Sequence, residues 1–241
     1  MNNKVEYVGK DLEAMDFAVN YHRWILEIIK PFLGEHLVEV GAGTGAFSEL
    51  LLETKPKTLS LVEPSTMVED LRNNLRRKDT TTEIQIFHDI FAAVAARLKS
   101  ENAPDSIIYI NVLEHIEDDS AELKTVWETL REKGRIFIFV PALPALFSEF
   151  DRRIGHFRRY RKTEIEEKCR AAQLRVVHSR YFDVTGIFPW LVKYRLMKSI
   201  TMESTAVQLY DKFVVPVAKP LESFLPPPIG KNLLVIAEKT A

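Results

Sequence analysis

The chain of 241 residues has one cysteine, almost no net charge and no long apolar segment. The single cysteine, Cys169, cannot form an intramolecular disulfide and excludes a cysteine-rich zinc site. Basic residues number 33 and acidic residues 34, so the overall charge predicts no nucleic-acid partner. The longest apolar run, 136–147, contains two prolines and is too short to cross a bilayer. Residues 1–16 lack the apolar core of a secretory signal, and we expect a cytoplasmic protein.

The order of apolar segments predicts the fold class. From residue 35 onward, short β-rich runs alternate with amphipathic helical stretches, which is typical of a parallel sheet covered on both faces. We therefore predict one Rossmann-like α/β domain over residues 1–241, with a seven-stranded, mostly parallel sheet. The predicted strands are His36–Gly41, Thr58–Glu63, Glu83–His88, Ser106–Asn111, Arg135–Val140, Leu174–Tyr181 and Leu233–Glu238. The predicted helices are Phe17–Lys30, within an N-terminal helical segment 1–34, and stretches at about 44–54, 65–78, 118–132 and 162–172.

Two long segments interrupt this alternation. Residues 141–161 follow the fifth predicted strand, and residues 183–231 follow the sixth. Long connections in a compact domain are usually functional, so we predict that both lie on the substrate side. Within the second, residues 186–198 mix bulky apolar side chains with cations. That mixture suits a lid over an apolar acceptor or a peripheral membrane contact, and equally packing on the core or a dimer contact.

A glycine-rich turn follows the first predicted strand. Gly41, Gly43 and Gly45 stand where a strand gives way to a helix, an arrangement that leaves helix-terminal amides free for a ligand. A dinucleotide fingerprint would place its third glycine at Ala46, where alanine is sometimes tolerated, so NAD remains an alternative. Glu39 would lie close to a pyrophosphate, which is unfavourable. The acid instead favours a cofactor that carries an amino group and a sulfonium.

The next three strands also end in residues suited to a nucleoside. Glu63 can accept hydrogen bonds from both hydroxyls of a ribose. Asp89 can accept from an adenine amine, or simply cap a helix, while Ile90 packs on the ring. Asn111 and Val112 follow the fourth strand, where a ligand at the switch point of the sheet would pass.

Together these four segments resemble the class I S-adenosylmethionine-dependent methyltransferases over residues 35–182. The resemblance implies S-adenosylmethionine as the cofactor and strand order 3-2-1-4-5-7-6 with the last strand antiparallel. It also implies contacts of the three glycines and Asn111 with the methionine part, of Glu63 with ribose, and of Asp89 and Ile90 with adenine. Residues 140–160 and 228–234 look like a subgroup often found with genes for glycan and lipid-linked sugar synthesis.

The resemblance implies transfer of a methyl group to an acceptor by in-line displacement, for which no metal is required. We predict a small-molecule or a lipid- or sugar-linked acceptor. His115, His156 and Tyr160 are the predicted general bases, needed only for a protonated acceptor. Arg158 and Arg159 are predicted to bind an anionic group of the acceptor, or else to pair with nearby acids. A non-catalytic cofactor-binding module stays an alternative, and the oligomeric state stays open.

Overall fold

The computed structural model describes residues 18–76 and 80–240. Three predictions rest partly on residues outside these ranges: the missing signal sequence in 1–16, the helix start at Phe17 and the end of the helix at 65–78. All other predicted elements fall within the described residues.

The strands form one seven-stranded sheet in the order β3-β2-β1-β4-β5-β7-β6. They are β1 (His36–Val40), β2 (Thr58–Val62), β3 (Glu83–Phe87), β4 (Ser106–Ile110), β5 (Arg135–Pro141), β6 (Leu174–Phe182) and β7 (Asn232–Lys239). Neighbours among β1 to β5 pair in parallel, whereas β7 runs antiparallel to both β5 and β6. The predicted sheet, its order and its antiparallel last strand are therefore confirmed, and every strand boundary falls within one residue of the prediction.

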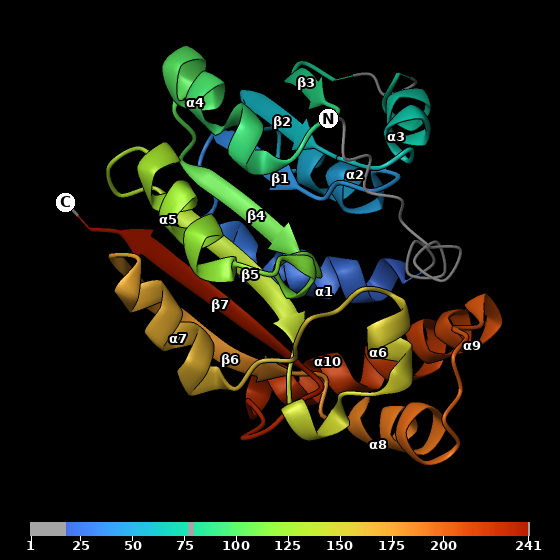
Figure 1. Cartoon of the computed structure of the whole chain (residues 1–241). Helices are drawn as coiled ribbons and strands as arrows, with labels where there is room; N and C mark the ends of the chain where they lie inside the picture. Colours follow the sequence, from blue (N-terminus) through green and yellow to red (C-terminus); the bar gives the residue numbers. More distant parts are fainter. Residues whose placement is uncertain (1–17, 77–79, 241) are drawn as a thin grey trace.

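Helices cover both faces of the sheet (Figure 1). One face carries α4 (Phe91–Asn102), α5 (Asp119–Thr129) and α7 (Lys162–Ala171), and their apolar side chains share one core with the sheet. The opposite core includes side chains of α1 (Val19–Ile29), α2 (Ala46–Leu52), α3 (Val68–Leu75) and α10 (Val215–Phe224). Because both faces are buried, the central strands are continuous apolar runs, which is why the sequence predicted them well.

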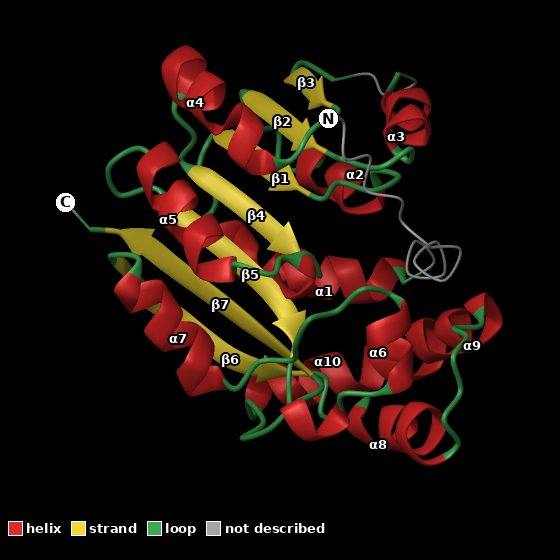
Figure 2. Cartoon of the chain, in the orientation of Figure 1, coloured by secondary structure: helices red, strands yellow, loops and turns green. Residues whose placement is uncertain are grey.

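The two long segments are largely helical. The first contains η4 (Pro144–Leu146) and α6 (Glu149–Arg153), and the second contains α8 (Ile187–Trp190), η5 (Leu191–Leu196), α9 (Ser204–Leu209), η6 (Tyr210–Val214) and α10. Figure 2 shows α6, α8 and α9 beyond the end of the sheet to which the arrowheads of β4 and β5 point. Both segments therefore lie where loops after parallel strands can surround a ligand.

Elements α9, η6 and α10 form one uninterrupted helix over 204–224. Hydrogen bonds to buried acids attach this helix to the rest of the fold. The carboxylate of Asp211 accepts hydrogen bonds from the backbone N–H groups of Asn20 (3.0 Å) and Tyr21 (2.8 Å). The carboxylate of Glu222 accepts from the N–H groups of Asp183 and Val184. One face of the long helix is thus held against α1 and the end of β6. No helix within the described ranges is both long and apolar enough to span a membrane.

Trp24 anchors α1 and offers a test of the fold. Its side chain is 1% exposed, and its ring lies 3.9 Å from that of Phe182, centroid to centroid. We expect Trp24→Ala to lower the free energy of unfolding by about 3–5 kcal/mol, because it leaves a cavity. The matched control, Val19→Ala, changes a residue of the same helix that is 51% exposed and should cost less than about 0.5 kcal/mol. Urea denaturation measures both, and equal losses would contradict this account of the core.

Candidate functional site

A cavity of about 710 Å³ opens at the carboxyl ends of the parallel strands. This volume lies within the range of small-molecule sites. One end is lined by the turn between β1 and α2, and the other by residues of α6, α8 and the 204–224 helix. The walls therefore combine the sheet edge with both long segments that sequence analysis placed on the substrate side.

The glycine turn presents backbone to this cavity. Gly41 and Gly43 have φ of +71° and +56°, which L side chains rarely adopt. A Cβ atom at Gly41 would lie 2.4 Å from Val112, so the close packing of the two loops requires glycine there. A Cβ atom at Gly43 would meet no atom within 4 Å. Gly43 therefore borders open space that a ligand can enter.

Glu63 fixes the position of this turn. Its buried carboxylate accepts hydrogen bonds from the N–H of Gly43 (2.7 Å) and the N–H of Ser65 (2.8 Å). One acid thus ties the turn after β1 to the loop after β2. Because a carboxylate has about four acceptor positions, both oxygens can accept further hydrogen bonds.

A second acid, Glu39, lies beneath the turn. It is 3% exposed and accepts a hydrogen bond from the Ser48 hydroxyl. Burial raises the pKa of the Glu39 carboxyl to about 8, and the neighbouring charge of Glu63 raises it further while Ser48 lowers it. The two acids make this end of the cavity favourable for a cation, which would stabilise the ionised form of Glu39.

The remaining predicted cofactor residues divide between the cavity wall and the surface. Ile90, Asn111 and Val112 line the cavity, and Asn111 has φ of +54° at the end of β4. Asp89 is exposed, and its carboxylate accepts from the N–H of Ile90 (2.8 Å). The other carboxylate oxygen keeps its acceptor positions for the predicted contact with an adenine amine.

Two predicted bases lie side by side in the cavity wall. The rings of His115 and His156 are 4.5 Å apart between centroids and nearly perpendicular. Burial lowers the pKa of His115 to about 3, and His156 lowers it further. Glu114, beside them, is fully buried, which raises the pKa of its carboxyl to about 8. The inward position of Glu114 could not be predicted, because nothing in the stretch 109–116 indicates that this acid points toward the cavity.

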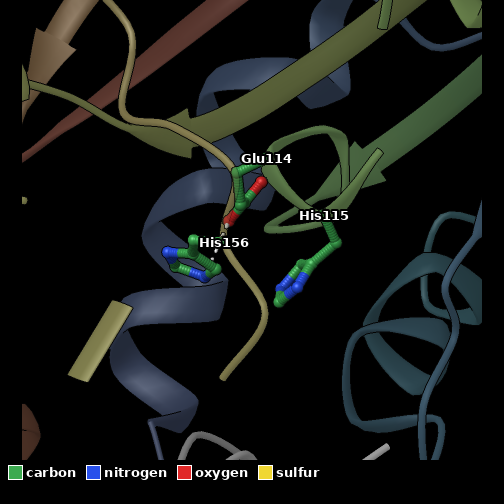
Figure 3. A group of neighbouring side chains, drawn as sticks. All are labelled: Glu114, His115 and His156. Carbon is green, nitrogen blue, oxygen red and sulfur yellow. Dashed lines mark ion pairs between the residues drawn. The ribbon is translucent and has the colours of Figure 1, made fainter. Parts of the chain in front are cut away.

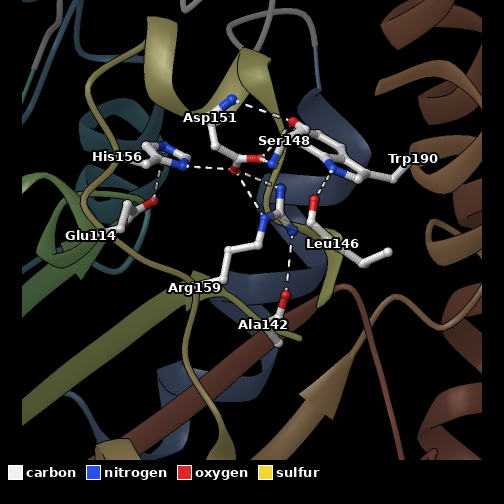
Figure 4. A network of polar contacts seen from close by, with 8 residues as sticks. All are labelled: Glu114, Ala142, Leu146, Ser148, Asp151, His156, Arg159 and Trp190. Atoms are coloured by element: carbon white, nitrogen blue, oxygen red, sulfur yellow. Dashed lines mark hydrogen bonds and ion pairs between the residues drawn. The ribbon is translucent and has the colours of Figure 1, made fainter. Parts of the chain in front are cut away.

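A buried network holds His156 and Arg159 in place (Figure 4). The Asp151 carboxylate lies 3.0 Å from His156 Nδ1 and accepts from Arg159 Nε at 2.9 Å. Arg159 also stacks on the Trp190 ring, with its guanidinium carbon 4.3 Å from the centroid. Arg159 lines the cavity, and its charge is paired with Asp151, which was the alternative interpretation.

Tyr160 and Arg158 turn toward α5 instead. Tyr160 belongs to the apolar core, and its hydroxyl donates to Asp119 (2.8 Å), whose charge together with burial raises the tyrosine pKa. Arg158 forms an ion pair with the same carboxylate at 2.7 Å and donates to the carbonyl of Glu117. These contacts are structural ones. The sequence could not distinguish them because the decisive partner, Asp119, lies about forty residues away.

Comparisons with known proteins agree with this geometry. The chain matches the family model of the methyltransferase domain over residues 16–179, more than half of its length. An S-adenosylmethionine-dependent methyltransferase from Archaeoglobus fulgidus has 15% identity and a TM-score of 0.60, with 95% of this chain and 98% of that chain covered. A Burkholderia thailandensis 1,6-didemethyltoxoflavin-N1-methyltransferase, solved with S-adenosylhomocysteine, has 17% identity and a TM-score of 0.58, with 97% and 83% covered.

A third structure is a chain from the Haloferax volcanii complex of the Trm112 methyltransferase activator. It has 14% identity and a TM-score of 0.62, with 97% of this chain and 95% of that chain covered. Among curated proteins, no sequence match was found. At these identities the solved structures establish a shared fold, and the family match adds the cofactor class.

The raised pKa of Glu39 predicts how stability varies with pH. A carboxyl whose pKa rises from 4.5 to about 8 on folding contributes stability below pH 4.5 and loses it as the pH rises through 8. Glu39→Gln cannot ionise, so we expect its free energy of unfolding not to fall in this way as the pH rises. From pH 5 to 8.5, the free energy of unfolding of the variant should rise relative to that of the wild type by on the order of a few kcal/mol. Parallel stability curves, measured by urea denaturation without cofactor, would contradict the assignment.

Proposed function

We propose an acceptor class for this chain, which belongs to the class I S-adenosylmethionine-dependent methyltransferases. The proposed acceptor is an apolar, lipid-linked molecule that the enzyme takes from a membrane surface. The main support for this proposal is the position of the 204–224 helix. Its inner face lines the cavity, and its outer face carries exposed apolar residues. A single helix thereby borders both the site and the surface from which a lipid would enter.

The cofactor part of the proposal assigns roles to the turn and to the ends of the strands. The open space beside Gly43 can take the methionine part, with Glu39 and Glu63 supplying negative charge for its cationic groups. Glu63 has acceptor positions left for the ribose hydroxyls. Asn111 and Val112 would border the reacting end, while Ile90 packs on adenine. When bound, S-adenosylmethionine supplies an electrophilic methyl group on its sulfonium sulfur.

The chain's own contribution to the reaction is positioning. An in-line displacement requires the acceptor atom, the methyl carbon and the sulfur to be nearly collinear, with water excluded. The buried Asp151 network holds His156 and Arg159 rigidly at the cavity wall. Near the proposed acceptor end, Phe150 and Tyr194 stack at 4.7 Å between centroids, and Tyr194 and Trp190 at 4.4 Å. These rings supply an apolar surface for a lipid chain.

The outer face of the long helix supports a membrane source for the acceptor. Its exposed apolar residues recur about every four positions, so they share one face. They are Leu209 (53% exposed), Phe213 (61%), Val217 (61%), Leu221 (64%), Phe224 (92%) and Leu225 (74%). Phe188, Leu196 and Met197, in or directly after α8 and η5, are similarly exposed. We call the six exposed apolar residues at 209–225 the apolar stripe; such a surface can lie in a lipid interface without spanning it.

A vesicle assay tests membrane contact. We expect the wild type to co-sediment with vesicles of phosphatidylcholine and phosphatidylglycerol, and the double variant Phe213→Ser/Leu221→Ser to bind at least about tenfold more weakly, because two apolar side chains are lost. Val19→Ser is the control, since Val19 is exposed but lies on α1. All three proteins should bind S-adenosylhomocysteine equally. Equal sedimentation of the wild type and the double variant would contradict membrane contact through the apolar stripe.

A labelling assay tests the acceptor class. The enzyme is incubated with S-adenosylmethionine that carries a labelled methyl group, together with either a total lipid extract or a water-soluble extract of cells. We expect the label in material that partitions into organic solvent, and only with the lipid extract. Label confined to water-soluble products would reject the lipid-linked acceptor while leaving the methyltransferase assignment intact.

A further inference from the structure

Glu114 is a buried acid whose carboxylate accepts no hydrogen bond from residues 18–76 or 80–240. It lies in η3 (Leu113–His115), directly after β4, and its side chain is fully buried. Neither carboxylate oxygen has a hydrogen-bond partner within the described residues. Burying an ionised carboxylate without such partners is costly, which is why the pKa of this carboxyl is raised; a bound cation would offset that cost.

Two imidazole rings face this carboxylate (Figure 3). His156 Nε2 lies 3.8 Å from Glu114 Oε1, which is too long for a hydrogen bond. One nitrogen from each histidine and one oxygen of Glu114 lie within 4.8 Å of one another. The three side chains come from two segments, η3 and the loop after α6, that the fold brings together at the cavity wall.

A hydrogen-bonding partner also orients each histidine ring. His156 Nδ1 lies 3.0 Å from Asp151 Oδ1, so its Nε2 is the nitrogen turned toward Glu114. His115 makes a hydrogen bond with the backbone of Gly155. A histidine that binds a metal almost always donates its other N–H to a carboxylate or a backbone carbonyl, which fixes the ring and its tautomer.

The neighbouring cation does not neutralise Glu114 by direct contact. Arg159 is committed to Asp151 and to the carbonyl of Ala142. Arg159 and Asp151 compensate one another, so no neighbouring cation among the described residues is in direct contact to stabilise the ionised form of Glu114; a bound cation would do so. A site with net negative charge and two nitrogen donors favours a divalent cation.

We propose that Glu114, His115 and His156 bind a divalent transition-metal ion of the zinc class. Two imidazole nitrogens and one carboxylate oxygen are a common donor set for such ions, which leave further positions open in catalytic sites. Tetrahedral ligands at bonds of about 2.1 Å are about 3.4 Å apart, so the donor atoms must approach one another by roughly 1 Å. All three residues line the cavity, so an ion that they held would be accessible from it.

An ion bound by these three residues could activate the acceptor. It would bind an oxygen of the acceptor and lower the pKa of a hydroxyl, whose proton leaves to water. The oxygen lone pair then forms the bond to the methyl carbon as the carbon–sulfur bond breaks, and that electron pair returns to sulfur. This role rests on the proposed function, whereas binding of the ion does not.

Binding of Zn²⁺ tests the site directly. The full-length chain is treated with a chelator, dialysed and titrated with Zn²⁺ by calorimetry, and with Co²⁺ by absorption spectroscopy. We expect one equivalent to bind the wild type, and binding to weaken at least tenfold in Glu114→Gln and in His156→Gln. His88→Gln is the matched control, because His88 is an exposed histidine outside the cavity lining. Visible Co²⁺ bands should appear with the wild type and His88→Gln only.

Folding of the variants is checked independently by S-adenosylhomocysteine binding. Glu114→Gln keeps the shape of the side chain and cannot ionise in its buried position, so it should fold at least as stably as the wild type. Wild-type affinity in both variants would overturn the site, as would failure of the wild type to bind either ion. Loss of metal binding with intact vesicle binding separates this result from a failure of the lipid proposal.

Discussion

The Glu63 carboxylate joins the ends of two parallel strands, because it accepts the amide hydrogens of Gly43 after β1 and Ser65 after β2. The rest of the site depends on this interaction. It holds the glycine turn open beside Glu39 and opposite Val112, at the point where strand order reverses between β1 and β4. Replacing the acid would leave a buried amide unpaired and allow the turn to close into the cavity.

At the opposite end of the cavity, buried acids hold a helix in place instead of a turn. There Asp211 and Glu222 attach the 204–224 helix to the fold through backbone amides, so that the apolar stripe can stay exposed without loosening the helix. Between the two ends, the Asp151 network positions His156 beside Glu114. Three separate sets of buried acids therefore fix the glycine turn, the 204–224 helix and the site proposed for the ion.

Most of the fold could be predicted from the sequence, and less of the site. The strands were predictable because burial on both faces makes each one a short apolar run. Helix α4 was missed because alanines also occupy its exposed face, which weakens the contrast between its buried and exposed sides. Gly43 and Glu63 were predictable from their position after successive strands. The burial of Glu114, the pairing of Tyr160 with Asp119 and the surface position of Asp89 were not, since each depends on contacts distant in sequence or on local backbone direction.

The central claim is that the turn fixed by Glu63 binds the adenosyl-amino-acid cofactor. Calorimetric titration with S-adenosylhomocysteine tests it most directly, using the wild type and Glu63→Gln, with NAD as the comparison ligand. The account predicts saturable binding of S-adenosylhomocysteine by the wild type, binding at least about tenfold weaker in the variant because a charged acceptor is lost, and no binding of NAD. Equal affinities in the two proteins, or binding of NAD alone, would contradict it.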